Sequence, residues 1–267
     1  MSEVRACLAA VRCFLWHLPL FFAAHPRTPL RVLGVVALDM LHVLRHSQRM
    51  PQTRTDALAL FLDLEGCANA AWDHKRVCLE EWRAIRQQLD DAGLAPVVHQ
   101  YLERLQGLES TRPSAGGDGL RLTQVRTYRE SVARLSITTA AQIAHAQDDC
   151  GDIGNQAHTA TNVDTLYRIL MQCQIIDDIF DYADDLSAGL PSFLTASTSP
   201  SESLASAAAA ARSYGEGHER SSNSVLPLRI TLWIFTTLTT FLIWIYGIKH
   251  SQRTHGRVWR WTAASGR

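Results

Sequence analysis

The chain has 267 residues, enough to bury one sizeable core, and its 26 Lys and Arg residues balance its 26 Asp and Glu residues. It contains no Walker loop, no GxGxxG and no alternation of basic and aromatic residues, which excludes the common nucleotide-binding motifs and a nucleic-acid groove. The charge is unevenly placed. Residues 1–50 carry six Arg against Glu3 and Asp39, a net of +4, and residues 220–267 carry six Arg and one Lys without an acid, a net of +7, so the middle carries −11.

Cysteine placement and hydrophobic periodicity indicate the class of protein. The six cysteines form no CxxC pair and no zinc-ligand spacing, which favours a reducing, cytoplasmic compartment. Apolar residues recur with a helical period along most of the chain, and strand-like alternation is scarce. We therefore expect an all-α protein.

Two apolar helices are predicted near the N-terminus. The first, Ala6–Ala24, is interrupted by charged residues and a proline and lacks the apolar core of a signal peptide, so we expect a helix that docks on protein or at an interface. The second, Pro29–His46, contains a single acid, Asp39. A buried lone carboxylate needs a partner, and either His42 at i+3 or a bound cation meets that need.

The next region, Thr55–Asp90, is predicted to form one or two helices. Asn69 and Asp73 lie one turn apart and present oxygen atoms on the same face. Two interpretations stay open. These side chains either bind a cation or are polar groups that cap the end of a helix just before the charged residues 74–76.

A further long helix is predicted over Leu122–Asp149. Arg126 and Arg129 lie one turn apart, and the planar guanidinium group is well suited to bind the oxygens of a diphosphate. An ordinary ion pair with Glu130 or with another nearby acid is the alternative.

The residues with the clearest chemistry lie in a helix predicted over Thr165–Leu186, which Gly189 and Pro191 should end. Gln174 and five aspartates fall within an arc of about 120° on the helical wheel. The aspartates are Asp177, Asp178, Asp181, Asp184 and Asp185. Like charges one turn apart destabilise a helix, so the stripe favours a bound cation, and Mg²⁺ fits its oxygen ligands. A solvated acidic face is the alternative.

The rest of the chain contains a low-complexity segment and one very apolar helix. Residues 197–224 are rich in Ser and Ala, and only Ser201–Tyr214 is predicted to be helical there. Ile230–Ile248 contains no charged residue and would span about 28 Å as a helix, close to the thickness of a bilayer's hydrocarbon core. It is predicted to be either a membrane anchor or a buried core helix, and the basic tail after it would lie on a cytoplasmic membrane surface.

Three stretches resemble one known superfamily. QIIDDIFDYADD, which begins at Gln174, is similar to the second aspartate-rich motif of trans-prenyl diphosphate synthases, where a Gln precedes DDxxD. ALDMLH, at residues 37–42, and TYRESVARLS, at residues 127–136, resemble segments of squalene and phytoene synthases, although His42 and Val43 replace acids of the family pattern. The chain thus resembles the class I isoprenoid synthase superfamily, and its squalene/phytoene synthase branch most of all.

This resemblance implies an isoprenoid synthase-like helical bundle around a central cavity and a Mg²⁺-dependent enzyme that ionises a prenyl diphosphate, as a prenyltransferase or terpene synthase. Asp177 and Asp181 would be catalytic. The implied metal ligands are Asp177, Asp178, Asp181 and Asp185, with Asp39, Asn69 and Asp73 on the opposite side. The implied substrate-binding residues are Gln174, Arg126, Tyr128 and Arg129.

On this interpretation the chain divides into a synthase-like domain (1–196), a low-complexity segment (197–224) and a C-terminal apolar helix with its basic tail (225–267). The expected partners are a prenyl diphosphate and, through residues 230–248, a membrane surface, with no nucleic acid. The alternative is a non-catalytic, membrane-associated helical protein that keeps the same fold. The incomplete first motif around Asp39 favours that alternative.

Overall fold

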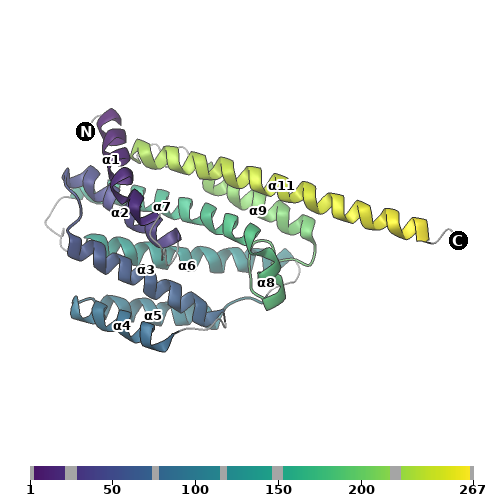
Figure 1. Ribbon diagram of the computed structural model, residues 1–267, viewed down its shortest axis with the longest axis horizontal. Coiled ribbons are helices and arrows are strands. Elements are labelled where there is room, and N and C mark those ends of the chain that lie inside the picture. Colours follow the sequence, from purple (N-terminus) through teal and green to yellow (C-terminus); the bar gives the residue numbers. More distant parts are fainter. Residues whose placement is uncertain are drawn as a thin grey trace. The chain divides into compact units, whose positions relative to one another are not determined.

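Helices account for nearly all of the residues that the computed structural model describes, which are 3–21, 29–73, 78–114, 119–145, 153–216 and 224–264 (Figure 1). No β-strand occurs in these ranges. The predicted all-α class is confirmed.

Most of the predicted helical segments are found as helices, and Ala95–Ser110, which no predicted segment covers, is helical as well. In the first part of the chain they are α1 (Glu3–Phe21), α2 (Pro29–His46), α3 (Gln52–Trp72), α4 (Leu79–Asp91) and α5 (Ala95–Ser110). They continue with α6 (Gly119–His145), α7 (Ile153–Phe180), α8 (Tyr182–Ala188), α9 (Pro200–Gly215) and α11 (Leu226–Ala264). The last four residues of the helix predicted over Leu122–Asp149 and the charged residues 74–76 lie outside the described residues.

The chain forms two compact units, each built from segments that are not contiguous in sequence. The first unit comprises Met1–Thr111, Glu130–Tyr167 and Glu219–Ile230. The second unit comprises Arg112–Arg129, Arg168–His218 and Thr231–Arg267. The long helices α6, α7 and α11 therefore contribute residues to both units.

The first unit is built from successive helices that pack on one another, α1 on α2, α2 on α3, α3 on α4 and α4 on α5. Leu58, Phe61 and Leu64 recur at helical spacing on α3 and are fully buried. The ring of Phe61 meets the ring of Tyr101 edge-on, with centroids 4.9 Å apart. The apolar spacing of α3 thus places it at the centre of this core.

Helix α1 docks on α2 with one face and exposes an apolar stripe on another. The buried positions are Ala6, Cys13 and His17. The exposed stripe consists of Val4, Leu8, Val11 and Leu15, which follow one another at three- and four-residue intervals. The expectation of a docking helix in this region therefore holds.

In the second unit, α9 packs between partners on α7 and α11. The Nε atom of Arg168 donates a hydrogen bond to the carbonyl oxygen of Tyr214 at 2.7 Å. The side-chain nitrogen of Gln172 donates to the carbonyl oxygen of Ala211 at 2.8 Å and to the hydroxyl of Thr236 at 3.1 Å. These bonds place the predicted helical part of the Ser- and Ala-rich segment inside a packed core.

The prediction of one continuous helix over Thr165–Leu186 is wrong. Helix α7 ends at Phe180, and α8 begins at Tyr182 and leaves the axis of α7 (Figure 1). Asp181 between them has φ −93° and ψ 6°. The break turns the chain so that the segment after α8 returns to the unit and buries Phe193. Gly189, with φ 67° in the left-handed region, ends α8 as predicted.

Helix α11 is the one described helix long and apolar enough to cross a membrane, over Leu226–Gly247. A core helix passes the same test of length and composition, so this property alone does not separate the two predicted roles.

Candidate functional site

The junction of α7 and α8 presents a row of carboxylates at the surface. Asp177, Asp181 and Asp184 are exposed, and Asp185 is half-buried. The amide of Asp181 donates to the carbonyl of Asp177, and the amide of Asp185 donates to that of Asp181, both at 2.9 Å. The one-turn backbone spacing of Asp177, Asp181 and Asp185 therefore continues through the helix break. Their carboxylate oxygens are not gathered at one point, since the acids, histidines and cysteines of the described residues that lie close enough together to hold a metal ion are Cys13, His17 and Asp39.

Asp178 occupies a different environment from its neighbours. Its side chain is buried, and one carboxylate oxygen accepts a hydrogen bond from the Arg129 guanidinium at 2.6 Å. The other oxygen accepts the amide hydrogen of Phe193 at 2.6 Å. Asp178 thus joins α6, α7 and the segment after α8.

Burial dominates the ionisation of Asp178. It raises the pKa of this carboxyl to about 7, while the positive charge of Arg129 and the amide of Phe193 oppose the rise and the nearby acids Asp185 and Asp177 add to it. Since both oxygens already accept strong hydrogen bonds, Asp178 acts in this arrangement as a structural anchor.

The residues predicted to bind substrate lie on α6 and α7 in the same unit. Arg126 donates to the hydroxyl of Ser213 at 2.8 Å, and its guanidinium lies 5.2 Å from the ring centre of Tyr214. Tyr128 is half-buried, with the guanidinium of Arg112 at 5.8 Å from its ring centre. Arg126 and Arg129 are predicted to act together on one diphosphate, but they hydrogen-bond to different helices, Arg126 to Ser213 on α9 and Arg129 to Asp178 on α7.

Gln174 is half-buried one turn before Asp178. Its side-chain oxygen is buried and accepts no hydrogen bond from the described part of the chain. The role of Gln174 in substrate binding stays a prediction.

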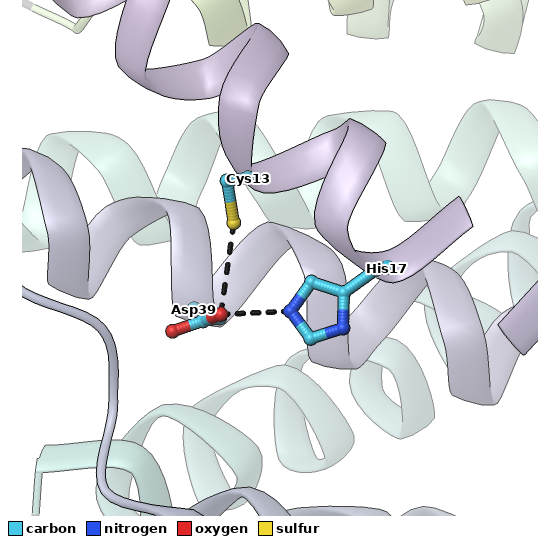
Figure 2. A group of neighbouring side chains, drawn as sticks. All are labelled: Cys13, His17 and Asp39. Carbon is cyan, nitrogen blue, oxygen red and sulfur yellow. Dashed lines mark hydrogen bonds and ion pairs between the residues drawn. The ribbon is translucent and has the colours of Figure 1, made fainter. Parts of the chain in front are cut away.

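Asp39 lies at the centre of a second cluster, between α1 and α2 (Figure 2). The side chain is fully buried, and one oxygen accepts the amide hydrogen of Met50 at 2.8 Å. The other oxygen accepts hydrogen bonds from Nε2 of His17 at 2.7 Å and from the Arg49 guanidinium at 3.0 and 3.1 Å. The thiol of Cys13 also points to this oxygen, at 3.6 Å. The histidine that reaches Asp39 is therefore His17, rather than His42.

The ionisation of this cluster follows from its hydrogen bonds. Burial alone would raise the pKa of Asp39, but the bonds from His17, Met50 and Arg49 outweigh that effect and lower the pKa to about 2. Burial, together with the adjacent Asp39 carboxylate, raises the pKa of the Cys13 thiol to about 12. At neutral pH the cluster thus holds an ionised carboxylate and a protonated thiol.

By ligand type, Cys13, His17 and Asp39 could hold a metal ion, since their ligand atoms all lie within 4.8 Å of one another. Nε2 of His17 donates to the ionised Asp39 in the tautomer that carries its hydrogen there, and the Arg49 guanidinium lies 3.2 Å from the same nitrogen. The guanidinium of Arg49 supplies the positive charge that the carboxylate requires. The arrangement therefore works as a buried ion-pair network that fastens α1 to α2, and its donor set does not identify Mg²⁺.

Sequence reasoning missed His17, Cys13 and Arg49 as partners of Asp39. The available signal was that Cys13 and His17 lie one turn apart on the same face of an apolar run. Nothing in the local pattern connected that face to Asp39, because their association depends on how α1 packs on α2.

The other predicted ligands lie at the end of α3. Asn69 is exposed, and Asp73 is half-buried at the C-terminal cap, where its amide donates to the carbonyl of Asn69 at 2.9 Å. Asn69, Asp73 and Asp39 belong to the first unit, whereas the α7–α8 carboxylates belong to the second. The role of these residues as metal ligands stays a prediction.

An open hollow of about 690 Å³ lies in the first unit. It is lined by Arg31, Leu60, Asp63, Glu81, Ala84, Ile85 and Gln88. None of the predicted site residues lines it, so the central cavity also stays a prediction.

Comparisons with protein-family models, with characterised proteins and with solved structures find no match to this chain. The resemblance to isoprenoid synthases therefore rests on the quoted motifs alone.

Proposed function

We propose that the protein is a Mg²⁺-dependent enzyme that ionises a prenyl diphosphate, as a prenyltransferase or terpene synthase. The observation that carries this proposal is the set of three carboxylates, Asp177, Asp181 and Asp185, on successive turns at the α7–α8 junction. Oxygen ligands on successive turns could close on a divalent cation that carries a diphosphate, because these exposed and half-buried side chains can turn toward a common ion.

The donor set fits Mg²⁺, which prefers carboxylate oxygens and keeps several waters and substrate oxygens as its other ligands. Asp177, Asp181 and Asp185 would hold the ion, and the buried Asp178 would fix the helix that carries them. When bound, Mg²⁺ stabilises the negative charge of a diphosphate leaving group. Arg126, on α6 of the same unit, would bind the remaining diphosphate oxygens.

A cytoplasmic location forms part of the proposal. Among the described residues, five cysteines have free thiols, namely Cys7, Cys13, Cys67, Cys78 and Cys173. Free thiols are usual in a reducing compartment.

The direct test is release of diphosphate from farnesyl or geranylgeranyl diphosphate by the purified full-length chain. We expect release that requires Mg²⁺ and stops when the ion is chelated. The matched control is the Asp184→Ala variant, because Asp184 is an exposed acid of the same segment outside the row of three and should keep full activity. Absence of Mg²⁺-dependent release from both substrates would contradict the proposal.

A second candidate is a non-catalytic, membrane-associated helical protein that retains an isoprenoid synthase-like fold. The observation that favours it is the environment of Asp39, whose two oxygens are already occupied by hydrogen bonds from His17, Arg49 and Met50. In this case the chain would release no diphosphate, and Mn²⁺, a spectroscopic substitute for Mg²⁺, would not bind to the α7–α8 carboxylates.

A further inference from the structure

Helix α11 exposes a continuous apolar face. Its members are Ile230, Trp233, Ile234, Leu238, Phe241 and Trp244, with exposed fractions between 41% and 65%. On a helical wheel these six positions fall within an arc of about 140°. Large apolar side chains scattered over a surface are ordinary, but a contiguous apolar face of this kind marks an interaction site.

The opposite face of α11 is held by the protein. Leu232, Thr239 and Ile243 are buried. The hydroxyl of Thr236 accepts a hydrogen bond from Gln172, and the ring of Tyr246 meets that of Tyr182 at 5.7 Å. If α11 crossed a bilayer as an isolated helix, it would lose these contacts with α7 and α8. The exposed face can therefore meet an apolar medium only while α11 lies along the surface of its unit.

The threonines on α11 do not oppose contact with lipid. Thr237 and Thr240 are exposed beside the apolar residues. Their hydroxyls donate to the carbonyl oxygens of Trp233 and Thr236, at 2.9 and 2.8 Å. Because these donors are satisfied within the helix, burying them in an apolar medium leaves no donor without an acceptor.

The charges of α11 indicate which apolar medium it meets. Its sequence contains Arg229, Lys249, Arg253, Arg257 and Arg260 and no acid, a net charge of +5. None of these charges lies between positions 229 and 249. Arg229 pairs with Glu3 at 2.7 Å, so the remaining basic residues of α11 follow the apolar face on its C-terminal side. A second copy of the chain would bring together two like-charged helices, whereas a bilayer with anionic headgroups is complementary to them.

We propose that α11 binds an anionic lipid bilayer in the plane of its interface, with the face around Trp233, Phe241 and Trp244 inserted and the basic residues that follow it in sequence against the headgroups. Amphipathic helices with apolar and basic surfaces bind membranes in this way. The inference does not depend on the proposed enzyme activity.

The first measurement is sedimentation of the full-length chain with vesicles. We expect binding to vesicles that contain phosphatidylglycerol, weaker binding to phosphatidylcholine alone, and weaker binding as salt is raised. Absence of binding to the anionic vesicles would overturn the proposal.

Variants test which face is used. Trp233→Ser and Phe241→Ser should each weaken partitioning by about tenfold, because each removes a large inserted side chain. Leu79→Ser is the matched control, since Leu79 on α4 is 64% exposed but lies outside α11. Circular dichroism verifies that each variant is folded. If the α11 variants instead dissociate a lipid-free dimer and leave vesicle binding unchanged, the face is a protein interface and the proposal fails.

Depth-dependent quenching by brominated lipids tests the orientation. Trp233 and Trp244 are eleven residues apart, about 16 Å along the helix axis. Each of the variants Trp233→Phe and Trp244→Phe lacks the fluorescence of one indole. For a helix in the interface plane, the fluorescence lost in both variants should be the component that lipids brominated at the same shallow position quench. Quenching of the two indoles at clearly different depths would indicate a spanning helix and overturn the in-plane geometry.

Discussion

The guanidinium of Arg129 lies 2.6 Å from the carboxylate of Asp178, and this ion pair separates one buried aspartate from its exposed and half-buried acidic neighbours. The second oxygen of Asp178 holds the amide of Phe193. Adjacent aspartates in one motif therefore have different roles, because Asp177 faces solvent and Asp178 faces the core.

The first prediction follows from this difference. Asp178→Ala should lower the free energy of unfolding by about 2 to 4 kcal/mol, because it removes one partner of a buried ion pair and leaves a buried amide without an acceptor. Asp181→Ala, the exposed control, should stay within about 0.5 kcal/mol of the parent. Urea denaturation monitored by circular dichroism provides both values. Equal losses in the two variants would show that the buried pair does not stabilise the fold.

The second prediction concerns the row of three carboxylates. Asp177→Ala and Asp181→Ala should each abolish most diphosphate release and most Mn²⁺ binding measured by electron paramagnetic resonance, while the helices remain intact. The double variant should be little worse than either single variant, since ligands of one ion act as a unit. Parallel loss of stability and activity would instead make the row structural.

The third prediction is a pH dependence that originates at Asp39. Because its folded-state pKa of about 2 lies below the ordinary value of 3.8, the carboxylate stabilises the fold above about pH 4 and loses that effect as pH falls toward 2. The difference corresponds to about 2 kcal/mol. Unfolding free energies measured between pH 5 and pH 2 should therefore fall less in Asp39→Asn than in the parent chain. Identical slopes for the two proteins would contradict this assignment.

The fourth prediction tests the packing of α9 on α11. A Cβ atom at Gly215 would lie 2.5 Å from the Cγ2 atom of Thr236, a stiff β-branched side chain. Gly215→Ala should therefore destabilise the protein by about 1 to 3 kcal/mol. Gly107→Ala on α5 is the matched control, since no atom lies within 4 Å of its Cβ position. This second change should be neutral or stabilising by up to about 1 kcal/mol. Thermal melts of both variants measure these stabilities. A Gly107→Ala variant that melts below the Gly215→Ala variant would contradict the prediction.

Local sequence determined the helices and several of their ends. The periodic apolar positions of Pro29–His46 and Ser201–Tyr214 were sufficient to place α2 and α9, because helix formation follows from spacing and propensity within a few turns. Gly189 ended α8 as predicted, since the left-handed conformation at that cap depends on the residue itself.

Only the tertiary structure decided what each acidic side chain does. The helical wheel placed Asp178 and Asp181 on one stripe, yet packing against Arg129 and Phe193 buries the first, whereas the second is exposed at the start of α8. For the same reason the partner of Asp39 is His17 rather than His42. A wheel records directions around one axis, whereas burial and hydrogen-bond partners depend on neighbouring helices that are distant in sequence.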